Sequence, residues 1–325
     1  MRRDLRMSDL PKAIEICEKG PREGIQIERA IIPTDRKIAL IDALAATGIK
    51  RIQTVSFVNP KRVPGWADAD DVVRGFTPVE GVQYTALWLN KQGLERALAF
   101  RDRLTYSETV SLPASEKFSL RNQNRTTEDN VRVQMNQAQV LAQQGIPLEG
   151  ALISAAFGCN FEGDIPIEHL LRTIERCFEI AASQGFTLKR LSLNDTMAWA
   201  TPESVKRVVA AIRERWPELR INLHFHNTRG LGIANAYAGL EMGVDSFDSS
   251  VGGLGGCPFA GHSGAAGNIC TEDLVFLCDE LGIATGIDLE KLIEAARLAE
   301  DVVGHALPGS VMRGGSLRRL RASLH

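Results

Sequence analysis

The sequence lacks the features that mark membrane and secreted proteins. No apolar run approaches the roughly 18–20 residues that a membrane-spanning helix needs. The charged N-terminal stretch Met1–Arg6 has no apolar segment behind it, so it does not have the form of a secretory signal. The six cysteines include no CxxC pair and no compact framework, which is typical of reduced thiols. These absences predict a cytoplasmic protein.

A large excess of charge is also missing. The formal net charge is −2, which gives no general attraction to nucleic acid or to acidic membranes. The one basic stretch, Arg313–Arg321, is interpreted as a solvated C-terminal end. We therefore expect neither nucleic acid nor a membrane as a partner.

What the chain does contain is a repeated alternation of short apolar β-rich runs and helix-period segments, with no linker between them. The expected strands are Ile14–Lys19, Arg51–Val58, Gln83–Trp88, Leu104–Val110, Gly150–Ala156, Leu191–Asn194, Ile221–His226 and Ser246–Val251. The clearest helical segments are Asp35–Thr47, Asp129–Gln144, Ile167–Gln184, Pro202–Arg215 and Leu231–Met242.

Eight such alternations in about 250 residues predict an α/β fold, a (β/α)₈ TIM barrel with additional C-terminal helices. A doubly wound open sheet is the alternative. We expect one catalytic domain over residues 1–325, with the barrel over about 12–270 and the extra helices over about 271–325.

Two histidines, His224 and His226, lie two positions apart in a predicted strand. Alternation places both imidazoles on one face of the strand, where they can bind a divalent ion at the mouth of a barrel. A polar core role is equally compatible with the pair alone.

Arg22 and Glu23 follow the first strand, where a carboxylate can complete a metal site and an arginine can stabilise an oxyanion. A surface ion pair in a turn is the simpler interpretation of these two residues alone.

Four glycines and Cys257 follow the last predicted strand, in the stretch Gly252–Pro258. This pattern indicates a flexible lid that delivers a thiol and excludes water, or else a plain glycine-rich turn. The loop continues to Asn268, whose side chain offers a further oxygen ligand.

Taken in order along the chain, these stretches resemble 3-hydroxy-3-methylglutaryl-CoA lyase and its relatives, the DRE-TIM metallolyases. The resemblance runs from Gly20 to about Leu292. Its blocks are Gly20–Gln26, Ser56–Lys61, Ala114–Glu116, Phe157–Cys159, Asn194–Thr196, His224–Thr228, Asp248–Pro258 and Gly264–Leu274.

The resemblance implies a divalent metal, Mg²⁺ or Mn²⁺, and a CoA thioester as substrate. The residues that it assigns to the metal are Glu23, His224, His226 and Asn268. Its catalytic positions are Arg22 for the enolate oxygen, Asp195 for proton transfer, Cys257 on the lid and the acidic Glu272. Lys61 and Arg62 are candidates for CoA phosphate contacts, with ordinary surface charge as the alternative. Family precedent also suggests a homodimer.

Four departures from the family pattern bear on the substrate. Glu23 replaces an aspartate, Gln53 replaces an acidic residue, Asn227 replaces an aspartate, and an arginine of the fifth strand is replaced near Glu149. A 3-hydroxyacyl-CoA such as citramalyl-CoA is therefore an alternative substrate to 3-hydroxy-3-methylglutaryl-CoA. A condensing synthase of the isopropylmalate or homocitrate type and a non-catalytic metal-binding barrel are the alternative functions.

Overall fold

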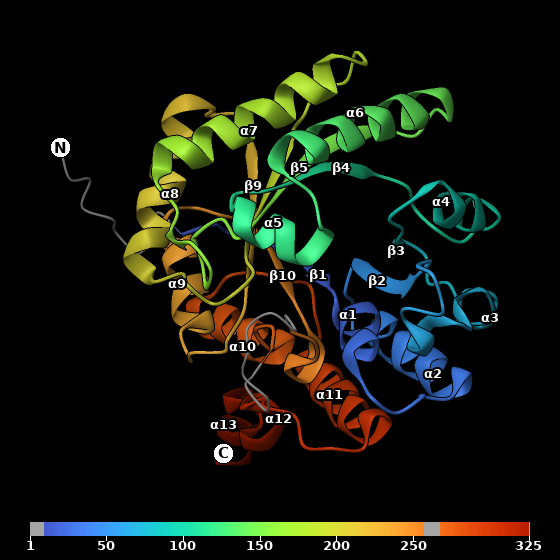
Figure 1. Ribbon diagram of the computed structural model, residues 1–325. Coiled ribbons are helices and arrows are strands. Elements are labelled where there is room, and N and C mark those ends of the chain that lie inside the picture. Colours follow the sequence, from blue (N-terminus) through green and yellow to red (C-terminus); the bar gives the residue numbers. More distant parts are fainter. Residues whose placement is uncertain (1–9, 257–266, 325) are drawn as a thin grey trace. The chain divides into compact units, whose positions relative to one another are not determined.

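The computed structural model describes residues 10–256 and 267–324. The chain divides into two compact units. We name the units by their place along the chain: the central unit contains Tyr106–Phe247, and the flanking unit contains Lys12–Thr105 and the described residues 248–256 and 267–324. Each unit alternates strands with helices, as the ribbon in Figure 1 shows.

The flanking unit is built on the strand order β3-β2-β1-β10. The strands are β1 (Glu15–Glu18), β2 (Arg51–Ser56), β3 (Gln83–Leu87) and β10 (Ser246–Ser249), the last entering from the central unit. Its helices are α1 (Gly20–Ile27), α2 (Thr34–Ala45), η2 (Pro64–Trp66), α3 (Ala69–Gly75), α4 (Lys91–Leu98) and η3 (Val251–Gly253). The expected C-terminal helices follow as α10 (Thr271–Leu281), α11 (Leu289–Val303), α12 (Val311–Gly314) and α13 (Leu317–Ser323).

The central unit is built on four parallel strands in the order β4-β5-β8-β9. They are β4 (Glu108–Pro113), β5 (Leu148–Ser154), β8 (Arg190–Asp195) and β9 (Arg220–Phe225). A short antiparallel pair, β6 (Gly158–Cys159) and β7 (Gly163–Asp164), follows β5. The helices are α5 (Glu116–Gln123), α6 (Thr127–Gln143), α7 (Ile167–Ala182), α8 (Pro202–Arg215) and α9 (Gly232–Glu241).

The expected strands and the principal helices are confirmed, with small differences at their ends. Helix α8 has the predicted start, because the Thr201 hydroxyl accepts a hydrogen bond from the backbone N–H of Ser204, with Pro202 in the first turn. The glycines that follow four of the helices, Gly48, Gly145, Gly185 and Gly243, all have positive φ.

Two local predictions were wrong. The fourth strand begins at Glu108, not at Leu104, because the Leu104 N–H donates to the carbonyl of Phe100 and closes a turn after α4. Gly20–Ile27 is helix α1, so the alternative interpretation of Arg22 and Glu23 as a surface pair in a turn was wrong. Its proline lies in the first turn, where the missing N–H costs nothing.

Among the described residues, no helix is long and apolar enough to cross a membrane. The described cysteines are free and buried, in agreement with the reduced thiols expected from the sequence.

Candidate active site

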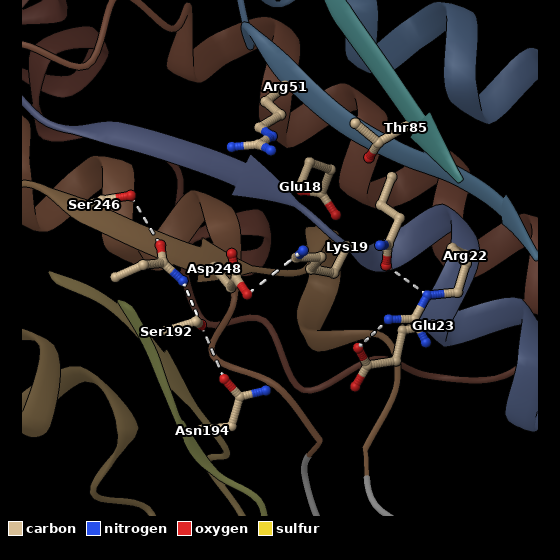
Figure 2. A network of polar contacts seen from close by, with 12 residues as sticks. Glu18, Lys19, Arg22, Glu23, Arg51, Thr85, Ser192, Asn194, Ser246 and Asp248 are labelled. Carbon is tan, nitrogen blue, oxygen red and sulfur yellow. Dashed lines mark hydrogen bonds and ion pairs between the residues drawn. The ribbon is translucent and has the colours of Figure 1, made fainter. Parts of the chain in front are cut away.

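In the flanking unit, Arg22 and Glu23 lie in the first turn of α1, and both side chains are 15% exposed. The Arg22 guanidinium donates through Nε to Oε1 of Gln53 (2.6 Å) and through Nη2 to Oε2 of Glu23 (3.2 Å). Figure 2 shows the contact between Arg22 and Glu23. Gln53 therefore aims the arginine, and the pair is a partly buried feature of the interior, not a surface ion pair.

Asn268 joins the same cluster from the segment before α10. Its Nδ2 lies within hydrogen-bond distance of Oε1 of Glu23 (3.2 Å), Oγ of Ser250 (2.8 Å) and the carbonyl of Leu254 (3.1 Å). Its Oδ1 is buried and accepts no hydrogen bond from the described residues. An orphaned buried oxygen beside a carboxylate suits a cation that prefers oxygen ligands, so Asn268 and Glu23 fit a hard divalent metal.

The base of the glycine loop packs against this cluster. Gly255 has a φ of +89°, and a Cβ added there would lie 2.9 Å from Nδ2 of Asn268 and 3.1 Å from Cγ of Glu23. A glycine is required at this position both for its conformation and for the close approach. Cys257, the predicted lid residue, lies outside the described residues.

Glu272 lies in the first turn of α10 and is fully buried. Its Oε2 accepts a hydrogen bond from the backbone N–H of Gly252 (3.0 Å), so it holds the base of the glycine loop. Burial raises the pKa of Glu272 to about 8, an effect that the Gly252 N–H only partly offsets.

Glu18 at the end of β1 is a second buried carboxyl group at this loop, and the sequence reasoning missed it. Its Oε1 accepts from the N–H groups of Gly20 and Val251, and its Oε2 accepts from the Thr271 hydroxyl at 2.6 Å. Burial raises the pKa of Glu18 to about 7. The signal available was a carboxylate on the same face of the predicted strand as the apolar Ile14 and Ile16.

In the central unit, the two histidines occupy the carboxyl end of β9. His224 lies in the strand and His226 directly follows it; both are 5% exposed, and their ring centroids are 5.0 Å apart. Nδ1 of His226 lies 2.8 Å from the backbone carbonyl of Asp195. Because a carbonyl only accepts, Nδ1 carries the hydrogen, and Nε2 keeps the lone pair that a metal ligand needs.

Asp195 ends the neighbouring strand β8 and is fully buried. Its Oδ1 accepts from the N–H groups of Trp199 (2.7 Å) and Ala200 (3.1 Å). Its Oδ2 accepts no hydrogen bond from the described residues. Burial raises the pKa of Asp195 to about 6, against the opposing effect of His226, so the group can exchange a proton near neutral pH.

The remaining predicted positions are two exposed cations, an amide that caps a helix and a carboxylate in an ion pair. Lys61 and Arg62 are exposed in the loop between β2 and η2, where a phosphate can reach them. Asn227 accepts a hydrogen bond from the N–H of Gly232, so its side chain caps the start of α9.

Glu149 lies at the amino end of β5 and forms an ion pair with Lys189 (2.8 Å). Because Glu149 is at the opposite end of the strands from Asp195, its inclusion among the site departures was wrong.

The chain matches the HMGL-like family model over residues 13–299. It is 41% identical over 298 residues to hydroxymethylglutaryl-CoA lyase YngG of Bacillus subtilis, covering 92% of this chain and 96% of that protein. It is 37% identical over 289 residues to the mitochondrial hydroxymethylglutaryl-CoA lyase of Mus musculus, covering 89% and 85% of the two chains.

Solved structures give the same picture. The crystal structure of the Bacillus subtilis HMG-CoA lyase matches with a TM-score of 0.85 at 38% identity, covering 94% of this chain and 98% of that one. An HMG-CoA lyase of Acinetobacter baumannii in complex with coenzyme A and 3-methylmalate matches with a TM-score of 0.81 at 37% identity, covering 97% of both chains. These matches confirm the predicted TIM-barrel fold class with additional C-terminal helices.

Proposed function

Since the chain belongs to the HMGL-like family, we propose that it is a divalent-metal-dependent carbon–carbon lyase acting on a 3-hydroxyacyl-CoA thioester. Membership confirms the family resemblance and the lyase class predicted from the sequence. The proposed reaction releases acetyl-CoA and an oxo acid from 3-hydroxy-3-methylglutaryl-CoA or a closely related thioester.

The metal ligands that we propose are Glu23, His224, His226 and Asn268. The observation that carries this assignment is the Asn268 amide, whose Nδ2 is directed at Glu23 while its buried Oδ1 accepts nothing from the described residues. The hydrogen on Nδ1 of His226 supports it further. A carboxylate, an amide oxygen and two imidazoles form a donor set that suits Mg²⁺ or Mn²⁺. When bound, such an ion would lower the pKa of the substrate's C3 hydroxyl and orient the chain.

The protein's own groups would move the protons. Asp195 takes the proton of the C3 hydroxyl, the bond between C2 and C3 breaks, and its electron pair passes into a thioester enolate. Arg22, which stays protonated, stabilises the enolate oxygen more than the ground-state thioester, and such differential binding accelerates the step. Cys257 then returns a proton to C2, giving acetyl-CoA.

Two candidate substrates, 3-hydroxy-3-methylglutaryl-CoA and citramalyl-CoA, differ in the length of the acyl chain. Glu23 is one methylene longer than the aspartate of the family pattern, and Gln53 contacts Arg22 where the pattern has an acid. The Acinetobacter baumannii relative was solved with coenzyme A and 3-methylmalate, a short hydroxy diacid. We therefore keep citramalyl-CoA beside 3-hydroxy-3-methylglutaryl-CoA as a candidate.

A panel of 3-hydroxyacyl-CoA thioesters, assayed for acetyl-CoA release with Mg²⁺ and with Mn²⁺, tests the proposal. We expect release from at least one member of the panel, abolished by chelation. Glu23→Gln should reduce release at least about tenfold. The matched control Glu149→Gln removes a carboxylate at the amino end of β5 and should leave release unchanged. Full activity of Glu23→Gln would exclude the proposed metal site.

Three broader properties belong to the same proposal. We propose that residues 1–325 form a single catalytic domain, because an eight-stranded barrel needs the strands of both units. Lys61 and Arg62 would contact the CoA phosphates, since both are exposed. A cytoplasmic location follows from the cysteine usage, and a homodimer follows from family precedent.

A further inference from the structure

Lys19 is a largely buried cation that the proposed chemistry does not use. It follows β1 and is the N-cap residue of α1, the helix that carries Arg22 and Glu23. Its side chain is 18% exposed, and its Nζ lies 3.6 Å from Oδ2 of Asp248, which is 7% exposed. Figure 2 shows the pair between β1 and β10. Removing an ammonium from water costs free energy, and interactions in the folded protein must offset that cost.

The ion pair does not use all the hydrogen-bonding capacity of Lys19. The ammonium has three N–H donors, and 3.6 Å is longer than a direct N–H···O hydrogen bond. The thiol of Cys17 in β1 also interacts with the ammonium. Lys19 therefore keeps donors for an anionic ligand.

Two arginines reinforce the positive potential around Lys19. Arg51 of β2 is the register partner of Cys17, and its Nη1 is 3.8 Å from Glu15. Arg22 lies in the next turn of chain. Burial is the largest single effect and disfavours the charged form of Lys19, but Asp248 and Cys17 together outweigh it, so the pKa of Lys19 is raised and the ammonium persists.

We propose that Lys19 is a specificity residue whose ammonium binds a free carboxylate of the acyl chain. Asp248 holds the ammonium in place, and the compact charge accepts a carboxylate oxygen from several directions. The enzyme would thereby favour acyl-CoA thioesters with a terminal carboxylate over uncharged chains of equal length. This inference rests on the proposed function, since it takes an acyl-CoA as the ligand.

Binding of two thioesters to the full-length protein with Mn²⁺ tests the proposal. Glutaryl-CoA and valeryl-CoA have acyl chains of five carbons and differ by one carboxylate. By isothermal titration calorimetry, the unmodified protein should bind glutaryl-CoA more tightly. Lys19→Met should weaken glutaryl-CoA binding about tenfold and leave valeryl-CoA within about twofold, since one modest charge contact is worth about that factor. The control Lys50→Met removes an exposed lysine of the same unit and should change neither affinity.

Lys19→Met leaves the Asp248 carboxylate buried without its cation, which could destabilise the fold. A second variant therefore separates loss of ligand binding from loss of folding. The double variant Lys19→Met with Asp248→Asn removes both charges and should show the same loss of preference for glutaryl-CoA. Lys19→Arg should retain the preference. If a folded charge-removing variant keeps the preference for glutaryl-CoA, or loses affinity equally for both thioesters, Lys19 serves only a structural ion pair. If the unmodified protein binds neither thioester, the proposed function itself fails.

Discussion

Asn268 is the residue whose environment most directly suggests a metal. Nδ2 of its amide lies within hydrogen-bond distance of three acceptors, including Glu23, so the orientation of Oδ1 is determined by the fold. A buried amide oxygen without a hydrogen bond costs free energy unless something compensates for it. A cation held between this oxygen and the Glu23 carboxylate would supply that compensation.

Replacing Asn268 with alanine should therefore weaken metal binding more than it weakens folding. We expect the dissociation constant for Mn²⁺ to rise at least about tenfold, measured by calorimetry on the chelated and reloaded protein. The control is Asn235→Ala, which removes another buried amide whose Nδ2 donates to the Ala200 carbonyl and whose Oδ1 accepts nothing from the described residues. Equal Mn²⁺ affinity in the two variants would remove Asn268 from the ligand set.

A separate prediction concerns Cys257, because its proposed role is to return a proton and not to bind the metal. Cys257→Ala should lower turnover by about 100-fold, the low end of the range for a positioned proton donor. Its Mn²⁺ affinity should stay within about twofold of that of the unmodified protein. The two quantities are measured on the same preparation by acetyl-CoA release and calorimetry. Undiminished turnover would assign the thiol no part in the reaction.

At this scale the sequence identified candidate reactive groups but not the residues that hold them in place. Arg22 and Glu23 are recognisable as an arginine–acid pair in a glycine-rich segment. The roles of Gln53 and Glu18 depend on residues more than thirty positions away, and spacing along the chain contains no information on such contacts. Lys19 belongs to the same class, because its partner Asp248 comes from a distant strand.

At the scale of elements, the glycine loop after β10 is anchored by two buried carboxyl groups. Glu18 accepts from the N–H of Val251, and Glu272 accepts from the N–H of Gly252. Burial raises the pKa of both groups, to about 7 and about 8. The loop base is therefore held by carboxyl groups that lose their protons between neutral and mildly alkaline pH.

This anchoring predicts a pH-dependent stability. The native state holds protons on Glu18 and Glu272 that the unfolded chain releases near pH 4.5, so the stability gained from them is lost as pH rises through about 7 to 8. Glu272→Gln keeps an acceptor for the Gly252 N–H but does not titrate. Its free energy of unfolding, from urea titrations between pH 6 and 9, should fall less steeply than that of the unmodified protein.

Glu280→Gln is the matched control for this slope. Hydrogen bonding to Arg321 lowers the pKa of Glu280, so this group stays ionised throughout the tested range. The control should reproduce the slope of the unmodified protein. A Glu272→Gln slope identical to that of the control would mean that Glu272 does not bind its proton more tightly in the folded state.

The boundaries of elements show where sequence patterns fail locally. In α1, Gly20, Pro21 and Gly24 have low helix propensity, yet proline is tolerated in a first turn and Gly24 lies against Leu254, where a Cβ would come within 2.7 Å. In β4 the alternation of buried Val110 and Leu112 marks the strand, whereas Leu104 is buried without belonging to it. Tertiary packing decides both cases, and propensity alone does not.

At the scale of the whole molecule, the eight-fold alternation of strands and helices was sufficient to predict the fold class. Short apolar strands that alternate with amphipathic helices are typical of parallel sheets whose faces are covered by helices. The matches to solved HMG-CoA lyases support the same fold class. The substrate is not predictable in this way, because it depends on a few polar side chains such as Lys19, Glu23 and Gln53.

The most direct test of the central claim is proton exchange at the methyl group of acetyl-CoA. The proposed site should form the thioester enolate from the product side, using Arg22 and the metal without the second product. In D₂O with Mg²⁺ or Mn²⁺, nuclear magnetic resonance should show deuterium entering the acetyl group, with no exchange after chelation or in Glu23→Gln. Protein shown to contain bound metal that supports no exchange would contradict the assignment of this chain as an enolate-forming lyase.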